Sequence, residues 1–176
     1  MRGLTLLSAA AVATLMTGVS FGADLMMAPP APAAAMTSDW TGGYIGVAGS
    51  WSQVQPSGDQ SVDLNVVVGA NLQTGMFLVG LEGHAGVDYD YTIASTQGTA
   101  GIAARAGFVV GDAALLYGAL GYDWYSGSGN TYYTASIGAE FMVSDSMSLD
   151  LRYTHGMGAN NANTTDAVSA GLNWHM

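Results

Sequence analysis

The chain has 176 residues, enough for one domain of ordinary size, and only 9% of them are charged, against roughly 25% in typical soluble domains. Its formal net charge of -10 with only 3 Lys and Arg residues argues against nucleic-acid binding, and the lack of Cys excludes disulfides, thiolate metal sites and Cys nucleophiles. A soluble surface with so few charges would promote association, so we expect an exterior that does not face water.

Residues 1–23 are expected to form a signal peptide for export. They carry one positive charge, Arg2, then an apolar run over 3–19, and then small residues. Cleavage after Gly22 and cleavage after Ala23 both fit this pattern. A retained membrane helix is the alternative, but no charged stop-transfer flank follows the apolar run.

Residues 24–38 are rich in Ala and Pro and are expected to form an extended arm. From 39 to 176 no stretch approaches 18 consecutive apolar residues, which argues against another membrane helix. Apolar and polar residues instead alternate with a period of two, as in strands. The pattern predicts eight strands, approximately at 42–54, 62–73, 76–91, 97–110, 113–125, 131–143, 147–157 and 166–176.

The connections between the predicted strands alternate in kind. Tight turns are expected at 74–75, 111–112 and 144–146. Looser, polar and mostly longer loops are expected at 56–60, around Ser95, at 126–130 and at 158–165. Short periplasmic turns that alternate with longer outer loops are typical of membrane barrels.

The stretch MFLVGLEGHAGVDYDY (76–91) shows how the two faces of a strand differ. Its apolar side chains fall on one face, whereas Glu82, His84, Asp88 and Asp90 fall on the other. A soluble sandwich with one wet face would alternate similarly, but its polar face would carry Lys and Glu where this chain has Gly, Ser, Thr and Asn. We therefore predict an all-β, eight-stranded antiparallel up-and-down transmembrane β-barrel over 39–176.

Aromatic residues are placed near both ends of the predicted strands, as in the interfacial belts of membrane barrels. Ordinary strand propensity is the alternative explanation. The predicted periplasmic belt consists of Phe77, Phe108, Phe141 and Trp174, and the outer belt of Trp51, Tyr89, Tyr91, Tyr122 and Trp124.

The charged residues on the inward faces are expected to pair, because an isolated charge inside a narrow barrel is costly to desolvate. We expect two ion-pair clusters, one joining Glu82 to Arg105 on neighbouring strands and one joining Glu140 and Asp150 to Arg152. A polar conduit or gate is the alternative. The predicted lumenal network comprises Glu82, His84, Arg105, Glu140, Asp150 and Arg152.

A second set of acidic residues maps near the outer ends of the strands, with no basic residue among them. They are expected to form a solvated rim, or alternatively a site for divalent cations that bridge lipopolysaccharide phosphates or a cation-selective mouth. The predicted rim comprises Asp59, Asp63, Asp88, Asp90, Asp123 and Asp166.

The segment DWTGGYIGVAGSW (39–51), after a signal peptide and an Ala/Pro arm, resembles the first strand of small porin-family outer-membrane β-barrel proteins of alphaproteobacteria. That group includes opacity-type surface antigens and hemin-binding relatives. The resemblance implies an eight-stranded barrel similar to the OmpA transmembrane domain, without a periplasmic peptidoglycan-binding domain. Family chains usually end on an aromatic residue, typically Phe, whereas this chain ends GLNWHM with Met176 last.

The three histidines each invite a chemical interpretation. His84 is expected to be a hydrogen-bonded lumenal residue, and a heme or metal ligand is the alternative that the hemin-binding relatives suggest. His155 falls on the lipid face, where lipid A deacylases place a catalytic His and Ser, but no Ser follows it closely and catalytic partners are missing. His175, at the terminus, is expected to have no chemical role.

No P-loop, GxSxG, HExxH or zinc-spaced cluster is present, so we expect neither an enzyme nor a cofactor. The expected role is structural and surface-interactive, in the bacterial outer membrane. A narrow porin-like channel for small solutes or ions is the alternative. Expected partners are outer-membrane lipid and lipopolysaccharide, the barrel insertion machinery, and host or surface ligands that bind the loops.

Overall fold

A computed structural model describes residues 39–111, 113–160 and 163–176. The predicted signal peptide (1–23) and the predicted arm (24–38) lie outside the described residues. Within the described part of the chain, no helix is long and apolar enough to cross a membrane.

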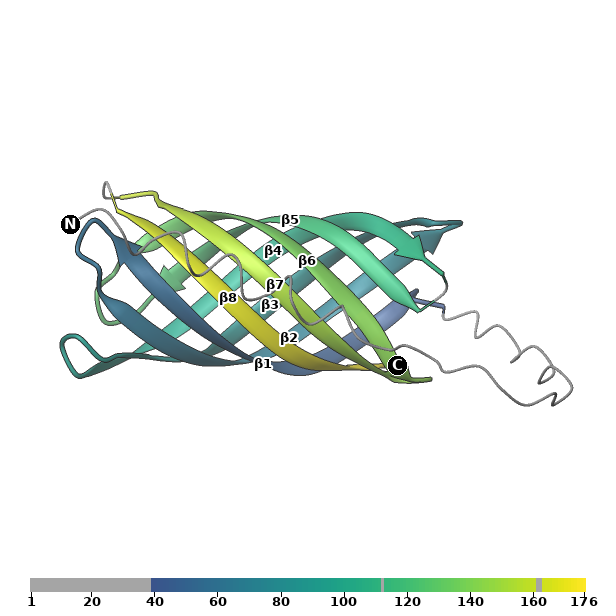
Figure 1. The fold of residues 1–176 in the computed structure, drawn as a ribbon, viewed down its shortest axis with the longest axis horizontal. Helices are drawn as coiled ribbons and strands as arrows, with labels where there is room; N and C mark the ends of the chain where they lie inside the picture. The colour runs from purple at the N-terminus through teal and green to yellow at the C-terminus, as the bar shows by residue number, and fades with distance from the viewer. Residues whose placement is uncertain (1–38, 112, 161–162) are drawn as a thin grey trace, which may run out of the picture. The chain divides into compact units, whose positions relative to one another are not determined.

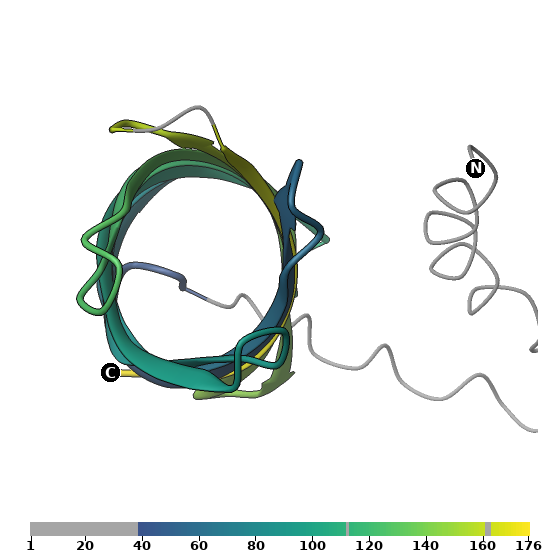
Figure 2. The same ribbon diagram turned by 90° about the vertical axis from the view of Figure 1, so that its left-hand side faces the viewer.

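Eight antiparallel strands form one closed barrel, in which each strand pairs with its sequence neighbours and the first pairs with the last (Figures 1 and 2). The predicted fold class is confirmed, and each strand end lies within two residues of its predicted position. The strands are β1 (Gly42–Gln55), β2 (Gln60–Thr74), β3 (Phe77–Asp90), β4 (Ser95–Val110), β5 (Ala114–Tyr125), β6 (Thr131–Ser144), β7 (Met147–Gly158) and β8 (Thr164–His175).

The two kinds of connection lie at opposite ends of the barrel (Figure 1). Tight turns join β2 to β3, β4 to β5 and β6 to β7. Gly75 and Gly111 occupy two of them with φ of 61° and 58°, a left-handed conformation that favours glycine. The loops at the other end are longer than these turns, but each spans only a few residues. The turn end is the periplasmic end of such a barrel, and the loop end is the outer one.

The outer face of the barrel is apolar along its length. Ile102, Leu120 and Ile137 expose 69%, 71% and 69% of their surface, and similar side chains cover every strand. A continuous apolar exterior of this kind requires lipid rather than water.

Aromatic side chains lie among these outward residues near both ends. The rings of Phe77 and Phe108 pack with centroids 5.0 Å apart at the turn end, and those of Tyr122 and Tyr133 lie 5.4 Å apart towards the loop end. The predicted belt residues all point outward, with exposed fractions between 36% for Phe141 and 57% for Phe77. Their assignment to the two membrane interfaces stays a prediction.

A small apolar cluster lies inside the barrel at the turn end. Trp40, which precedes β1, is only 1% exposed and packs in this cluster with Leu78 and Leu115. Its ring meets the ring of His175 edge-on, with centroids 5.4 Å apart. Figure 2 shows the first described segment, at the purple end of the colour scale, lying inside the ring of strands. Residue 40 was not among the residues that the sequence singled out.

Candidate functional site

Two tyrosines reach the middle of the lumen because each lies over a glycine on the next strand. Tyr44 is the register partner of Gly69, and Tyr117 is the register partner of Gly138. A Cβ atom at either glycine would overlap the tyrosine ring. The glycines therefore let each ring pass over the neighbouring strand and carry its hydroxyl to the central charges.

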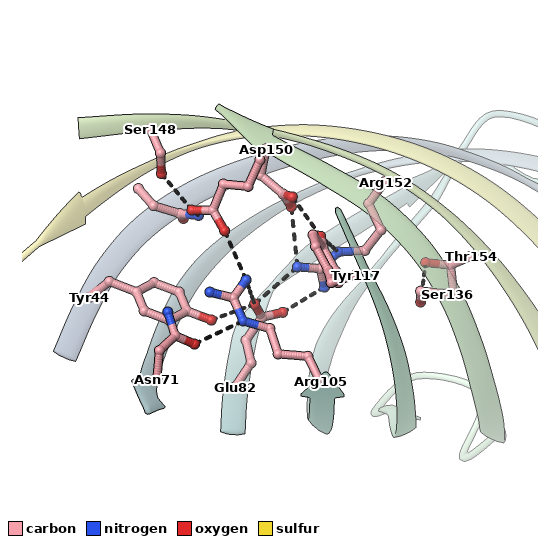
Figure 3. A network of polar contacts seen from close by, with 12 residues as sticks. Tyr44, Asn71, Glu82, Arg105, Tyr117, Ser136, Ser148, Asp150, Arg152 and Thr154 are labelled. Carbon is pink, nitrogen blue, oxygen red and sulfur yellow. Dashed lines mark hydrogen bonds and ion pairs between the residues drawn. The ribbon is translucent and has the colours of Figure 1, made fainter. Parts of the chain in front are cut away.

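Arg152 of β7 joins three other central groups (Figure 3). Its Nη1 donates to Glu82 Oε1 at 2.6 Å and its Nη2 donates to Glu82 Oε2 at 3.0 Å, so this pair is bidentate. Nη2 also donates to Asp150 Oδ2 at 3.1 Å, and Nε donates to the Tyr117 hydroxyl at 2.8 Å. That hydroxyl in turn donates to Asp150 Oδ1 at 2.5 Å.

Arg105 of β4 is the second cation of the lumen. Its Nη1 donates to Glu140 Oε2 at 2.9 Å and lies 3.8 Å from Glu82 Oε2. Its guanidinium carbon lies 4.7 Å from the centroid of the Tyr44 ring and 5.3 Å from that of Tyr117, in cation–π range of both. The Tyr44 hydroxyl donates to Glu82 Oε2 at 2.7 Å. Because the Glu82 carboxylate lies within 4 Å of both arginines, it links the two cations.

Glu140 extends the network towards the turn end. Its Oε1 accepts hydrogen bonds from the Ser148 hydroxyl at 2.5 Å and from Asn173 Nδ2 at 2.8 Å. His175 Nε2 lies 2.8 Å from the same Ser148 hydroxyl and 3.4 Å from Glu140 Oε1. His175, for which no chemical role is expected, therefore contacts this carboxylate, and that expectation stays a prediction.

The network combines deep burial with charge. Glu82, Arg105, Glu140 and Asp150 are respectively 5%, 3%, 0% and 6% exposed. Buried ions are tolerated only when partners and additional hydrogen bonds offset their desolvation. Both arginines of the described residues lie here, opposite three carboxylates, so each charge depends on the others.

The contacts of this network differ from the predicted pairing. The sequence predicted two clusters, with Glu82 bound to Arg105. The structure shows one connected network, in which Glu82 makes its short contacts with Arg152 and Arg105 makes its short contact with Glu140. The reason is barrel closure, because β3 and β7 lie four strands apart in an eight-stranded ring and so face each other across the lumen.

His84 lies outside this network. Its Nε2 is 3.6 Å from Asp123 Oδ1, and no contact joins it to Glu82 in the described structure. Asp123 is the register partner of Gly101, which in turn pairs with His84, so the small glycine lets the two side chains meet. Asp123 was predicted at the outer rim; it lies inside the lumen instead.

A polar chamber in the lumen adjoins the network, and Glu82, Asp150 and Arg152 form part of its wall. It has a volume of about 110 Å³, and its wall includes Ser50, Asp63, His84 and Asp123. A second cavity of about 340 Å³ lies nearer the loops, and Asp59, Asp88 and Asp90 line it. The predicted acidic rim is therefore partly a set of inward carboxylates rather than a solvated edge.

Asp166, the remaining predicted rim residue, is on the outward face. Its Oδ1 accepts a hydrogen bond from the Tyr153 hydroxyl at 2.6 Å and lies 2.8 Å from His155 Nδ1. His155 thus has a carboxylate neighbour that the sequence analysis did not identify. The period-two alternation could have identified this group, because Tyr153, His155 and Asp166 all fall on outward-facing positions of β7 and β8. His155 and Asp166 are also register partners.

The residues that sequence reasoning missed are mostly uncharged members of the network. Tyr44, Tyr117 and Asn71 could have been found from their inward parity alone. Asn71 Oδ1 accepts a hydrogen bond from Arg105 Nε at 3.0 Å. Among the described residues, no group of three or more His, Cys, Asp or Glu side chains is arranged to hold a metal ion.

A closed antiparallel barrel with an apolar exterior, a polar lumen of paired charges and alternating turns and loops defines a small outer-membrane β-barrel protein. The chain belongs to the family described as outer membrane protein beta-barrel domain, whose model matches residues 21–175. The protein is therefore located in the bacterial outer membrane.

Solved structures share this fold at low sequence identity. Ail of Yersinia pestis has a TM-score of 0.56 at 14% identity, over 77% of this chain and 99% of that one. Neisserial surface protein A has 0.53 at 13%, over 77% and 98%. The outer membrane enzyme PagL has 0.51 at 13%, over 74% and 99%. No curated protein matches the chain.

Proposed function

We propose that this protein is a non-conducting structural barrel of the outer membrane, whose role is to stabilise the envelope and to present its outer end to surface ligands. The observation that carries the proposal is the bidentate pair between Arg152 and Glu82, which joins opposite walls of the lumen. A solute on its way through the barrel would have to separate these groups.

The energetic argument is that opening the network exposes several buried charges at once. Each ion loses partners that offset its desolvation, at a cost of several kcal/mol per ion. The Tyr44 and Tyr117 hydroxyls bind the same carboxylates, so they would also lose partners. A closed lumen is therefore the favoured state of the resting barrel.

A second barrier supports the same function. The apolar cluster of Trp40, Leu78 and Leu115 lies at the turn end of the lumen, where the Trp40 ring meets that of His175. Hydrated ions are excluded by a packed apolar constriction, because they would lose water without gaining polar contacts. The ion-pair network and this cluster act in series.

Conductance in planar bilayers tests the proposal against the narrow-porin alternative. The refolded protein is expected to give no discrete openings. The double variant Trp40→Ala with Arg152→Ala removes one element of each barrier and is expected to give openings more often than either single variant. Regular openings of the unmodified protein would contradict the proposal and favour transport of small solutes or ions.

The outward polar group of Tyr153, His155 and Asp166 does not support an enzyme. PagL is described as an enzyme, but a similarity at 13% sequence identity indicates a shared fold and not a shared activity. His155 is bound to Asp166, and no nucleophilic side chain hydrogen-bonds to that histidine in the described structure. We propose a non-enzymatic protein, and lipid turnover that is lost on His155→Ala would overturn this.

We also propose the partners that the fold calls for. Outer-membrane lipid and lipopolysaccharide would cover the apolar exterior, and the barrel insertion machinery would recognise the C-terminal strand, where Trp174 points outward before Met176. Host or surface ligands would meet the short loops. The kinship with alphaproteobacterial porin-family proteins also remains a proposal, and it rests on the segment at 39–51.

A further inference from the structure

Residues 39–41, which precede β1, place one large side chain inside the lumen. Asp39 and Thr41 are exposed, whereas Trp40 between them is buried, and the first described segment runs inside the ring of strands (Figure 2). Gly42 permits this course, because its φ of 139° is a conformation that favours glycine. A Cβ atom at Gly42 would also lie 2.6 Å from the Met176 carbonyl oxygen. The first residue of β1 therefore has to be a glycine for the chain to turn inward.

The backbone at the start of β1 is held from both sides. Gln73, near the end of β2, accepts a hydrogen bond from the Trp40 backbone N–H through its Oε1 at 3.0 Å. The Gln73 backbone N–H donates to Thr41 Oγ1 at 3.2 Å. On the other side, the Met176 backbone N–H donates to the Gly43 carbonyl oxygen at 2.9 Å. The inward turn is thus fixed by β2 and by the residue that follows β8.

The packing site of the Trp40 ring is built from walls that meet only in the closed barrel. Leu78 belongs to β3, Leu115 belongs to β5, and His175, whose ring centroid lies 5.4 Å away, is the last residue of β8. The strands β1 and β5 lie four positions apart in the ring of eight and face each other across the lumen, whereas β1 and β8 become neighbours only through closure. The complete site therefore does not exist before the first and last strands have paired.

His175 connects this packing site to the seam between β1 and β8. Its register partner on β1 is Tyr44, and the centroids of the two rings lie 5.6 Å apart. Its Nε2 lies 2.8 Å from the hydroxyl oxygen of Ser148 on β7. The Trp40 ring thus packs on a side chain that both neighbours of β8 hold in place.

Packing alone holds the indole ring. Trp40 Nε1 is buried and has no hydrogen-bond partner in the described part of the chain. Burial therefore costs this group the hydrogen bond that it makes with water in the unfolded chain. Because the apolar contacts of the ring have to offset this cost, the ring stays in its site only while the surrounding walls remain together.

We propose that Trp40 and Gly42 form a latch that locks the seam between β1 and β8 from inside the lumen, and that the latch forms after the barrel has closed. Backbone hydrogen bonds join these two strands as they join every other pair. The latch adds contacts to β3 and β5, so the seam opens at the turn end only when the ring leaves its site. A contact that forms after the transition state of folding slows unfolding and leaves the folding rate unchanged.

The first test follows Trp40 itself. The other tryptophans, Trp51, Trp124 and Trp174, are exposed on the outward face, so replacing all three with Phe leaves a barrel whose single tryptophan lies in the lumen. In lipid vesicles, its fluorescence is expected to be shielded from acrylamide in water and from brominated acyl chains. During refolding from urea, this shielding should appear no earlier than the closed form, which heat-modifiable gel mobility reports. Quenching in the folded protein, or shielding before closure, would overturn the latch.

The second test uses Gly42→Ala, which leaves the indole ring intact. The new methyl group would strain the backbone and overlap the chain end. The ring should become accessible to acrylamide, and unfolding should accelerate on the order of tenfold or more while the folding rate changes by less than about threefold. Trp40→Ala should accelerate unfolding on the order of a hundredfold or more, again with little change in the folding rate.

Gly43→Ala is the matched control for this substitution. A Cβ atom there would lie 3.6 Å from Met176 Cε and 3.8 Å from the Gly69 carbonyl oxygen, which are ordinary contacts. This variant should keep Trp40 shielded and the unfolding rate unchanged. Equal effects of the two glycine substitutions, or a loss of stability that appears in the folding rate, would contradict the latch. If Gly42→Ala does not fold, the order of closure and shielding in the single-tryptophan protein still decides the matter.

The latch stands apart from the closed lumen of the proposed function. A barrel that conducts while Trp40 stays shielded and Gly42→Ala unfolds faster would contradict the closed lumen and leave the latch in place. A silent barrel in which acrylamide quenches Trp40 would give the reverse result. The two sets of experiments therefore fail separately.

Discussion

Arg152 and Glu82 lie 70 positions apart in the sequence, yet their side chains form a bidentate ion pair with N–O distances of 2.6 and 3.0 Å. Their strands, β7 and β3, face each other across the closed barrel. Because backbone hydrogen bonds join only neighbouring strands, this contact is one of the few that tie opposite walls together. The lumenal charges therefore stabilise the barrel in a direction that the sheet itself does not.

Replacing Arg152 with Ala is expected to lower the free energy of unfolding by about 3–5 kcal/mol, because it leaves Asp150 without its cation and Glu82 with only the longer contact to Arg105. Urea unfolding of the refolded protein in micelles or lipid vesicles measures this change. Arg105→Ala should behave similarly through Glu140. The control is Asp59→Ala in the loop after β1, expected to change stability by no more than about 0.5 kcal/mol. Equal stabilities of the three variants would contradict a stabilising network.

A double-mutant cycle isolates the cross-lumen pair. Glu82→Gln and Arg152→Met are each expected to destabilise the barrel, and together they should cost less than the sum of the single effects, with a coupling energy of about 0.5–3 kcal/mol. The reason is that each single change leaves a buried charge unpaired, whereas the double change removes both charges. Strictly additive unfolding free energies would show that the pair makes no energetic contribution.

Trp40→Ala is expected to destabilise the barrel by about 3–5 kcal/mol, because it empties a buried apolar site. The matched control is Trp174→Ala, a tryptophan that is 54% exposed on the outward face, where lipid would fill the space. Unfolding followed by intrinsic fluorescence compares the two variants in the same lipid. A larger effect at residue 174 would mean that interfacial anchoring matters more than packing within the lumen.

Gly69→Ala and Gly138→Ala are each expected to cost about 1–3 kcal/mol, because the new methyl group would displace the ring of Tyr44 or Tyr117 from the network. Gly118→Ala is the control, since a Cβ there would lie 3.7 Å from the Ser136 carbonyl oxygen, an ordinary contact. Thermal unfolding, read from heat-modifiable gel mobility, ranks the three variants. If all three melt together, the tyrosines do not depend on the glycines.

The strands, their order and the facing of each side chain could be predicted from the sequence. Period-two alternation states which residues share a face, so Glu82 and Arg105 were correctly expected in the lumen, and Phe77 and Trp174 outside. Alternating turns and loops predicted the even number of strands. These are local properties of the chain, because strand geometry repeats every two residues.

The partners of the inward charges could not be predicted in the same way. Neighbouring register suggested that Glu82 would bind Arg105, but the short contact is with Arg152. Likewise Asp123 was expected at the rim and instead meets His84. Long side chains reach across a lumen that is only a few side chains wide, so the choice of partner depends on curvature and closure rather than on spacing in the chain.

The sequence by itself determined that this chain crosses the membrane as strands and which side chains face lipid or lumen. The physical reason is that successive side chains of a strand point to opposite faces. Only the tertiary structure decided which charges meet, that Tyr44 and Tyr117 join them, and that the buried Asp88 Oδ2 lacks a partner. Those facts depend on contacts between strands far apart in the sequence, and ring closure creates them.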